Sequence, residues 1–70
     1  MAGEAKLGVR LKDVRTKAGL TQAELANLAR VSRKTINTVE NGVFIPSTVL
    51  ALRLASALGT TVEALFFLTD

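Results

Sequence analysis

Two short helices joined by a tight turn, predicted near the middle of the chain, constrain its fold more than any other feature. Thr21 and Glu24 form a T-x-x-E capping box, which predicts a helix over residues 22–29. After a short break, Ser32 is placed to cap a second helix over residues 33–41. The small and apolar residues of this stretch have the spacing that two helices packed at a steep angle require. They are Ala26, Val31, Ile36 and Val39.

The second of these helices has one face without apolar side chains. On a helical wheel its apolar residues fall on one side, with Glu40 at the edge. The other side is a polar stripe made of Arg33, Lys34, Asn37, Thr38 and Asn41. In a DNA major groove, Arg or Lys can donate to guanine and Asn can pair bidentately with adenine. The stripe therefore favours a DNA-reading helix, and a plain solvated face, which most surface helices have, is the alternative.

Four segments together resemble a known family. They are GLTQAELANLA, VSRKTINTVENG, PSTVLALRLASALG and TTVEALF, and they extend over about residues 7–67. In this order and spacing, the chain resembles the helix-turn-helix of the lambdoid phage repressor and Cro family, also called XRE-like. The resemblance implies an all-α fold: a repressor-like bundle of five short helices with a helix-turn-helix at about residues 22–41, in one DNA-binding domain over residues 1–70. It also implies that the third helix enters the major groove, usually in a dimer.

The polar stripe and the resemblance together predict which residues face DNA. We expect base edges to be read by Arg33, Lys34, Asn37 and Thr38. We expect Gln22 and Asn41 to hold the DNA backbone, because Gln22 opens a helix whose free N–H groups and positive dipole end favour a phosphate. A plain first-turn residue is the alternative for Gln22.

The chain departs from the family pattern at two places. Arg30 occupies the turn position that usually holds glycine, and a left-handed conformation there costs a non-glycine residue about 1 kcal/mol. Arg30 could offset this by reaching a phosphate of the DNA backbone, and solvent exposure is the alternative. The loop after Gly42 commonly carries basic residues in the family, whereas residues 43–46 read VFIP here. An apolar patch is therefore expected beside the DNA face.

An ion pair is expected to brace the recognition helix. The apolar residues that predict a first helix are Leu7, Leu11, Val14 and Ala18. Arg15 lies next to this stripe, and Glu40 lies at the edge of the apolar face of its own helix. Because matching residues pair across the first and third helices of the family, the resemblance implies a structural ion pair between Arg15 and Glu40. Two independent surface charges are the alternative.

The C-terminal third predicts two more helices. Pro46 and Ser47 open a fourth helix, and residues 49–58 are apolar nearly all round, so this helix should be central to the core. Thr60 or Thr61 caps a fifth helix, and the sequence does not decide between them.

Phe67 and Leu68, which follow the fifth helix, have no obvious role within the domain. They either join the core or help to form an apolar patch that a second copy of the chain covers, and we favour the dimer interface. Phe44 and Ile45 could extend that patch.

Composition excludes several function classes. The 70 residues include no Cys and no His, which rules out disulfides and removes the commonest metal ligands and general base. No glycine-rich phosphate loop or serine paired with a base is visible, so we expect no enzyme, no metal and no cofactor. There is no secretory signal pattern, and the apolar runs are too short to span a bilayer, so a cytoplasmic protein without a membrane partner is expected.

The charge is unevenly distributed. Residues 1–34 carry eight basic and three acidic side chains, whereas residues 35–70 carry one basic and three acidic ones. A basic half and a mildly acidic half suit a module with one face on a polyanion. The partner we expect is therefore double-stranded DNA.

Three functions remain open at this point. The first is a sequence-specific transcriptional regulator, in particular a repressor that binds a palindromic operator as a homodimer. The second is a protein-interaction or antitoxin-like module on a helix-turn-helix scaffold. The third is the DNA-binding half of a longer ligand-responsive regulator, because the segment PSTVLALRLASALGTTVEALF resembles the start of bacterial regulators that continue into a ligand-binding domain. No small-molecule ligand is expected within this chain itself.

Overall fold

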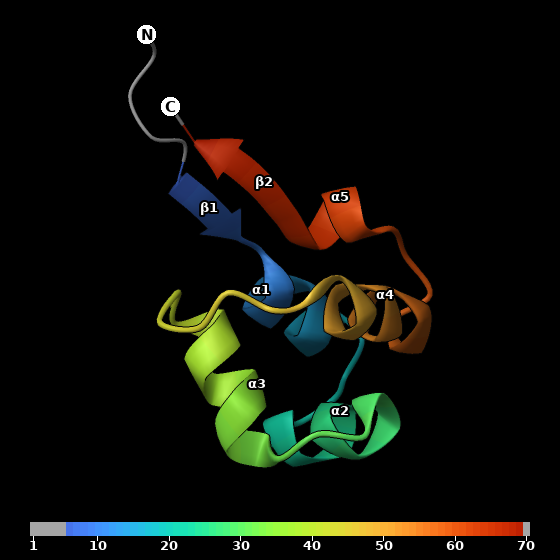
Figure 1. Ribbon diagram of the computed structural model, residues 1–70. Helices are drawn as coiled ribbons and strands as arrows, with labels where there is room; N and C mark the ends of the chain where they lie inside the picture. The colour runs from blue at the N-terminus through green and yellow to red at the C-terminus, as the bar shows by residue number, and fades with distance from the viewer. Residues whose placement is uncertain (1–5, 70) are drawn as a thin grey trace, which may run out of the picture.

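The computed structural model describes residues 6–69, and within them it contains five helices and a two-stranded antiparallel sheet. In chain order the elements are β1 (Lys6–Val9), α1 (Leu11–Lys17), α2 (Gln22–Ala29), α3 (Arg33–Glu40), α4 (Thr48–Ala57), α5 (Val62–Leu65) and β2 (Phe66–Thr69). The two strands lie side by side at one end of the molecule, and α2 and α3 lie at the opposite end (Figure 1).

The five helices match the expected bundle, but the expectation of a strictly all-α fold is wrong. Leu7 belongs to β1 rather than to the first helix, which begins only at Leu11. At the other end, Phe66 belongs to β2, so that α5 is a single turn. Strand pairing joins residues far apart in the sequence: Lys6 lies opposite Thr69, whose side-chain hydroxyl also donates to the Lys6 carbonyl, 63 residues away, at 3.1 Å. Periodicity within either segment carries no information about such a distant partner.

Four helices begin at a hydroxyl side chain that caps a free backbone N–H group. The Thr21–Glu24 capping box is present in both directions, and Ser32 and Ser47 cap α3 and α4 as expected. Thr61, not Thr60, caps α5, because its hydroxyl accepts from the Ala64 N–H at 3.2 Å. The backbone N–H of Thr60 instead bonds the Ala55 carbonyl at 2.9 Å and closes the end of α4.

The core lies where the helices meet. Its largest fully buried side chains are Leu11, Leu25, Ile36, Val39, Leu54 and Leu65. α4 contributes only one face to this core, since Val49 and Leu52 are 58% and 56% exposed. Its all-round apolar sequence had predicted a fully central helix. A second apolar face of α4 is therefore exposed.

Candidate nucleic-acid interface

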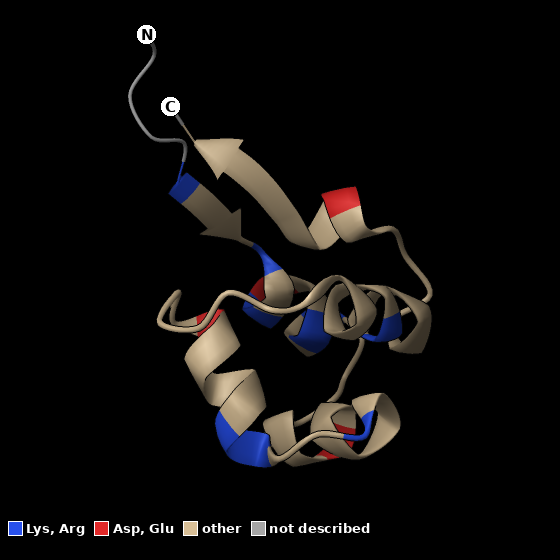
Figure 2. Cartoon of the chain, viewed as in Figure 1, with Lys and Arg blue, Asp and Glu red and all other residues tan. Residues whose placement is uncertain are grey.

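α3 presents its polar stripe to solvent because its apolar side is locked into the core. Ile36 and Val39 are completely buried against the rest of the bundle. Arg33, Lys34 and Asn37 are exposed on the other side of the helix. In Figure 2 the ribbon at the start of α3 is blue and lies at the end of the molecule away from the strands. The rest of the helix and the loop that follows it carry no further cation.

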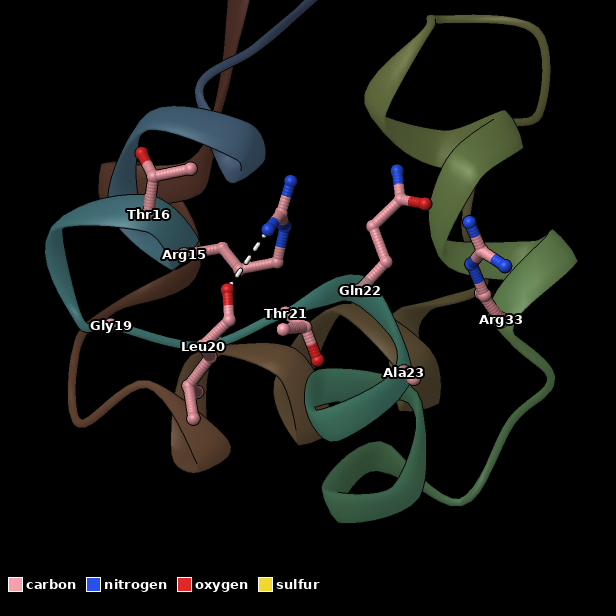
Figure 3. A pocket seen from close by; sticks show the side chains of 8 residues that line it. All are labelled: Arg15, Thr16, Gly19, Leu20, Thr21, Gln22, Ala23 and Arg33. Atoms are coloured by element: carbon pink, nitrogen blue, oxygen red, sulfur yellow. Dashed lines mark hydrogen bonds between the residues drawn. The ribbon is translucent and has the colours of Figure 1, made fainter.

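The start of α2 and the stripe of α3 enclose a shallow hollow of about 290 Å³, lined by Gln22, Arg33, Lys34 and Asn37. A second hollow of about 560 Å³ continues from Gln22 and Arg33 toward α1 (Figure 3). Gln22 therefore stands between α1 and α3, at the junction of the two hollows. The fold thus brings one of the predicted backbone-binding residues together with three of the predicted base-reading residues.

The ion pair expected between Arg15 and Glu40 is present and nearly closed to solvent. Arg15 Nε donates to Glu40 Oε2 at 2.6 Å and Nη2 donates to Oε1 at 3.2 Å, and the two side chains are 9% and 2% exposed. Arg15 Nη1 also donates to the Leu20 carbonyl at 2.9 Å, the bond drawn in Figure 3. The hydrogen bond with Glu40 raises the pKa of Arg15 above its ordinary value, against the opposing effect of burial. The pair ties the end of α3 to α1 and to the turn before α2.

An amide network extends from this pair to the surface of α3. Gln22 Nε2 donates to Glu40 Oε1 at 3.0 Å and to Asn37 Oδ1 at 3.3 Å. Asn41 Nδ2 donates to the same Asn37 oxygen at 3.1 Å. The sequence analysis did not anticipate this network. The available signal was the position of Glu40 at the edge of the apolar face, within reach of a long amide on the preceding helix.

Two hydrogen-bonding groups of the site are partly used inside the protein. Both amide hydrogens of Gln22 are committed, so the group it has left for a phosphate is its main-chain N–H at the start of α2. The hydroxyl of Thr38 donates to the carbonyls of Lys34 and Thr35 at 3.1 and 3.0 Å, so its single O–H hydrogen is already used within α3.

Arg30 adopts the left-handed conformation expected for the turn, with φ 61°. Its side chain is exposed and lines a separate hollow with Arg53 of α4 and with Leu28. The structure therefore does not bring Arg30 to the hollow that holds the stripe of α3. Among the described residues it is the one non-glycine residue with positive φ.

Phe67 and Leu68, for which the sequence favoured a shared dimer interface, lie on β2 and face opposite sides of the sheet. Phe67 pairs with Gly8 in the register, its ring covers that glycine, and the Arg10 guanidinium stacks 4.0 Å from the ring centroid. This contact gives Phe67 an intradomain role. Leu68, by contrast, is 72% exposed.

The apolar loop after α3 is also exposed, with Val43, Phe44 and Ile45 at 77%, 47% and 73%. Ile45 lines a hollow of about 220 Å³ with Leu52 of α4, Leu7 of β1 and Phe66 of β2. The expected apolar patch therefore exists, and it joins the loop to α4 and to one face of the sheet.

Comparison with known proteins agrees with this geometry. The helix-turn-helix domain family matches residues 6–66, and the chain belongs to this family of XRE-like regulators. It is 43% identical over 61 residues to an uncharacterized HTH-type transcriptional regulator of Methanothermobacter thermautotrophicus, covering 86% of this chain and 88% of that one.

Two solved structures are similar. The restriction-modification controller protein C.AhdI from Aeromonas hydrophila has a TM-score of 0.75 at 39% identity, covering 77% of this chain and 82% of that one. The clp gene regulator ClgR from Corynebacterium glutamicum has a TM-score of 0.74 at 33% identity, covering 77% and 57%. The chain is thus a DNA-binding transcriptional regulator of the helix-turn-helix type.

Residues 6–69 contain neither a membrane-spanning helix nor a cluster of metal-binding side chains. None of the helices there has the length and apolar content needed to cross a membrane. The same residues contain no group of three or more His, Cys, Asp or Glu side chains arranged to hold a metal ion.

Proposed function

We propose that this regulator is a repressor that binds a palindromic operator as a homodimer and acts by occupying promoter DNA. The observation that carries the proposal is the hollow between α2 and α3, where two exposed cations and two amides stand on one rigid surface. Such a surface can enter a major groove, and the main-chain N–H groups in the first turn of α2 that the Thr21 cap does not use can bind a phosphate. A protein with this role works beside the chromosome, in the cytoplasm.

Within this proposal the residues divide into two groups. Arg33, Lys34, Asn37 and Thr38 face base edges, with Arg33 and Lys34 as donors to guanine. Gln22, through its main-chain N–H, and Asn41, at the far end of the stripe, hold the DNA backbone. Arg30 can reach only a more distant phosphate, because it lies outside the hollow.

The test is selection of bound sequences from random duplex DNA at near-physiological salt, followed by gel shifts at increasing salt. Phosphate neutralisation makes the binding constant fall steeply between about 50 and about 200 mM salt. Arg33→Ala should weaken binding and relax one base position per half-site. Arg53→Ala, which removes the same charge from an exposed position on α4, is the matched control and should leave the preferred sequence unchanged.

The homodimer is proposed to form over the exposed apolar face of α4 and the sheet. Leu68, Ile45 and Leu52 are each more than half exposed, although all three are large apolar side chains. We assign the interface role first to Leu68, because Phe67 already covers Gly8. Two copies related by a two-fold axis would place their α3 helices in successive major grooves, about 34 Å apart.

Sedimentation of the wild type at micromolar concentration tests this assembly. Leu68→Ser should give a folded monomer with much weaker operator binding. A wild type that stays monomeric both free and on DNA would exclude the dimer.

A second candidate function is a protein-interaction module, favoured by the exposed Val43, Phe44 and Ile45 beside the end of α3. These side chains would bind another polypeptide, and DNA binding would be secondary. The salt series separates the two candidates, since an apolar protein contact does not weaken with salt as phosphate contacts do.

A further inference from the structure

The orientation of the amide groups on the α3 surface follows from the ion pair beneath them. The carboxylate of Glu40 accepts two hydrogen bonds from Arg15, and its Oε1 lies 3.0 Å from the Gln22 amide nitrogen. An ionised carboxylate can only accept hydrogen bonds. The Gln22 side chain must therefore turn its NH₂ group toward Glu40, because the flipped amide would place two acceptor oxygens in contact without a hydrogen between them.

The same NH₂ group then determines how Asn37 is oriented. The second amide hydrogen of Gln22 points to Asn37 at 3.3 Å, so the Asn37 atom that meets it must be the acceptor, Oδ1. Asn41 Nδ2 donates to this oxygen from the next turn of the helix at 3.1 Å. An amide oxygen has two lone pairs, and both are now used. Asn37 consequently turns its own Nδ2 group away from the network.

Asn37 is exposed and lines the hollow with Arg33 and Lys34, so its Nδ2 group faces the outside. Within residues 6–69 that group has no hydrogen-bond acceptor. Bidentate pairing of Asn with adenine needs a free amide oxygen for the N6 amine as well as a donor for N7. Asn37 offers the donor alone.

We propose that Asn37 is a donor-only specificity residue that selects an acceptor-only base edge, guanine or thymine O4, and rejects adenine, with Gln22 as the positioning residue. This inference rests on the proposed DNA-reading role of α3 and names the edge that this helix reads. Guanine offers two acceptors in the major groove, N7 and O6, and thymine offers O4. Adenine accepts at N7 alone and presents its N6 donor where Asn37 has no free acceptor. The assignment replaces the Asn–adenine pairing expected from residue type.

Selection from random duplex DNA with the full chain tests the proposal, using wild type, Asn37→Ala, Gln22→Met and Asn27→Ala. The wild type should show one position per half-site where adenine is disfavoured by roughly 5- to 100-fold, the range that one mismatched base pair typically costs. Asn37→Ala should abolish the preference at that position. Gln22→Met keeps the side-chain length, frees Asn37 Oδ1 and should restore binding to adenine there. Asn27→Ala removes an exposed amide from α2 outside the hollow and should change nothing.

A second variant, Asn41→Ala, frees the other lone pair of Asn37 and should also raise the tolerance for adenine. Modified duplexes then separate the two acceptor bases. If guanine is read, 7-deazaguanine, which lacks N7, should weaken binding. If thymine O4 is read, replacement by uracil, which keeps O4 and loses only the methyl group, should leave binding nearly unchanged.

Adenine selected at the Asn37-dependent position would overturn the inference, as would a preference that survives Asn37→Ala. Either result would leave DNA reading by α3 intact. If the wild type bound DNA without any sequence preference, this result would instead contradict the proposed function itself. Circular dichroism of each variant is the control that distinguishes a changed base preference from unfolding.

Discussion

Disruption of the Arg15–Glu40 pair should show that this contact holds the recognition helix in place. Arg15→Met preserves much of the aliphatic packing but leaves the Glu40 carboxylate, 2% exposed, with Gln22 as its remaining partner among the described side chains. An exposed ion pair contributes only about 0.2–1 kcal/mol. Breaking a buried pair costs about 3–5 kcal/mol, because the charge that remains has lost both water and its partner. Since Arg15 is itself 9% exposed, we expect the lower end, about 3 kcal/mol.

That loss is large for this chain. A domain of 70 residues has a free energy of unfolding of about 4–10 kcal/mol. With a urea m-value of about 1 kcal/mol per molar, the unfolding midpoint of Arg15→Met should fall by about 3 M. Urea titration followed by circular dichroism measures the shift. The loss of stability in Arg15→Met should be as large in high salt, because salt screens a buried ion pair much less than an exposed one.

A double-mutant cycle with Glu40→Leu gives the decisive comparison. Replacing both charges by apolar groups leaves no isolated buried charge, so the double variant should be less destabilised than either single variant. If the two single losses simply added, or if Arg15→Met cost less than about 0.5 kcal/mol, the contact would be an ordinary surface pair and the argument for a braced α3 would fail.

Three further predictions concern other parts of the molecule. Gly8→Ala should cost about 1 kcal/mol because its new methyl overlaps the Phe67 ring, and thermal melts should show no such cost in a Phe67→Ala background. Hydrogen bonds from Thr21 hold the pKa of Glu24 below its ordinary value, so its ionised form stabilises the fold above the unfolded-state pKa and loses this effect as the pH falls. Glu24→Gln keeps the capping geometry without titrating, so the difference in Tm from wild type should shrink between about pH 7 and about pH 3, and a constant difference would contradict this. Arg33→Ala should lose about 1–3 kcal/mol of discrimination at one base position in sequence selection while its Tm stays unchanged, and an unaltered base preference would exclude Arg33 as a reader.

Local chemistry was sufficient to predict the helix-turn-helix. A capping hydroxyl acts on a backbone N–H only a few residues away, so Thr21, Ser32 and Ser47 could be identified as helix starts from the sequence. Helical periodicity is also a local property, and it correctly predicted that Ile36 and Val39 face inward and the polar stripe faces outward. The Arg15–Glu40 pair was different: its partners are 25 residues apart, and it was expected from the family resemblance.

The features that escaped prediction all depend on residues distant in the sequence. Pairing of β1 with β2 turned the expected ends of two helices into strands, because each strand satisfies its backbone groups only through the other. That pairing also sent Phe67 and Leu68 to opposite faces of one sheet. The donor-only presentation of Asn37 arises in the same way: a carboxylate on α3 orients an amide from α2, and that amide orients a third side chain. Residue type states which hydrogen bonds a side chain can make, but the neighbours brought by the fold decide which of them remain free for DNA.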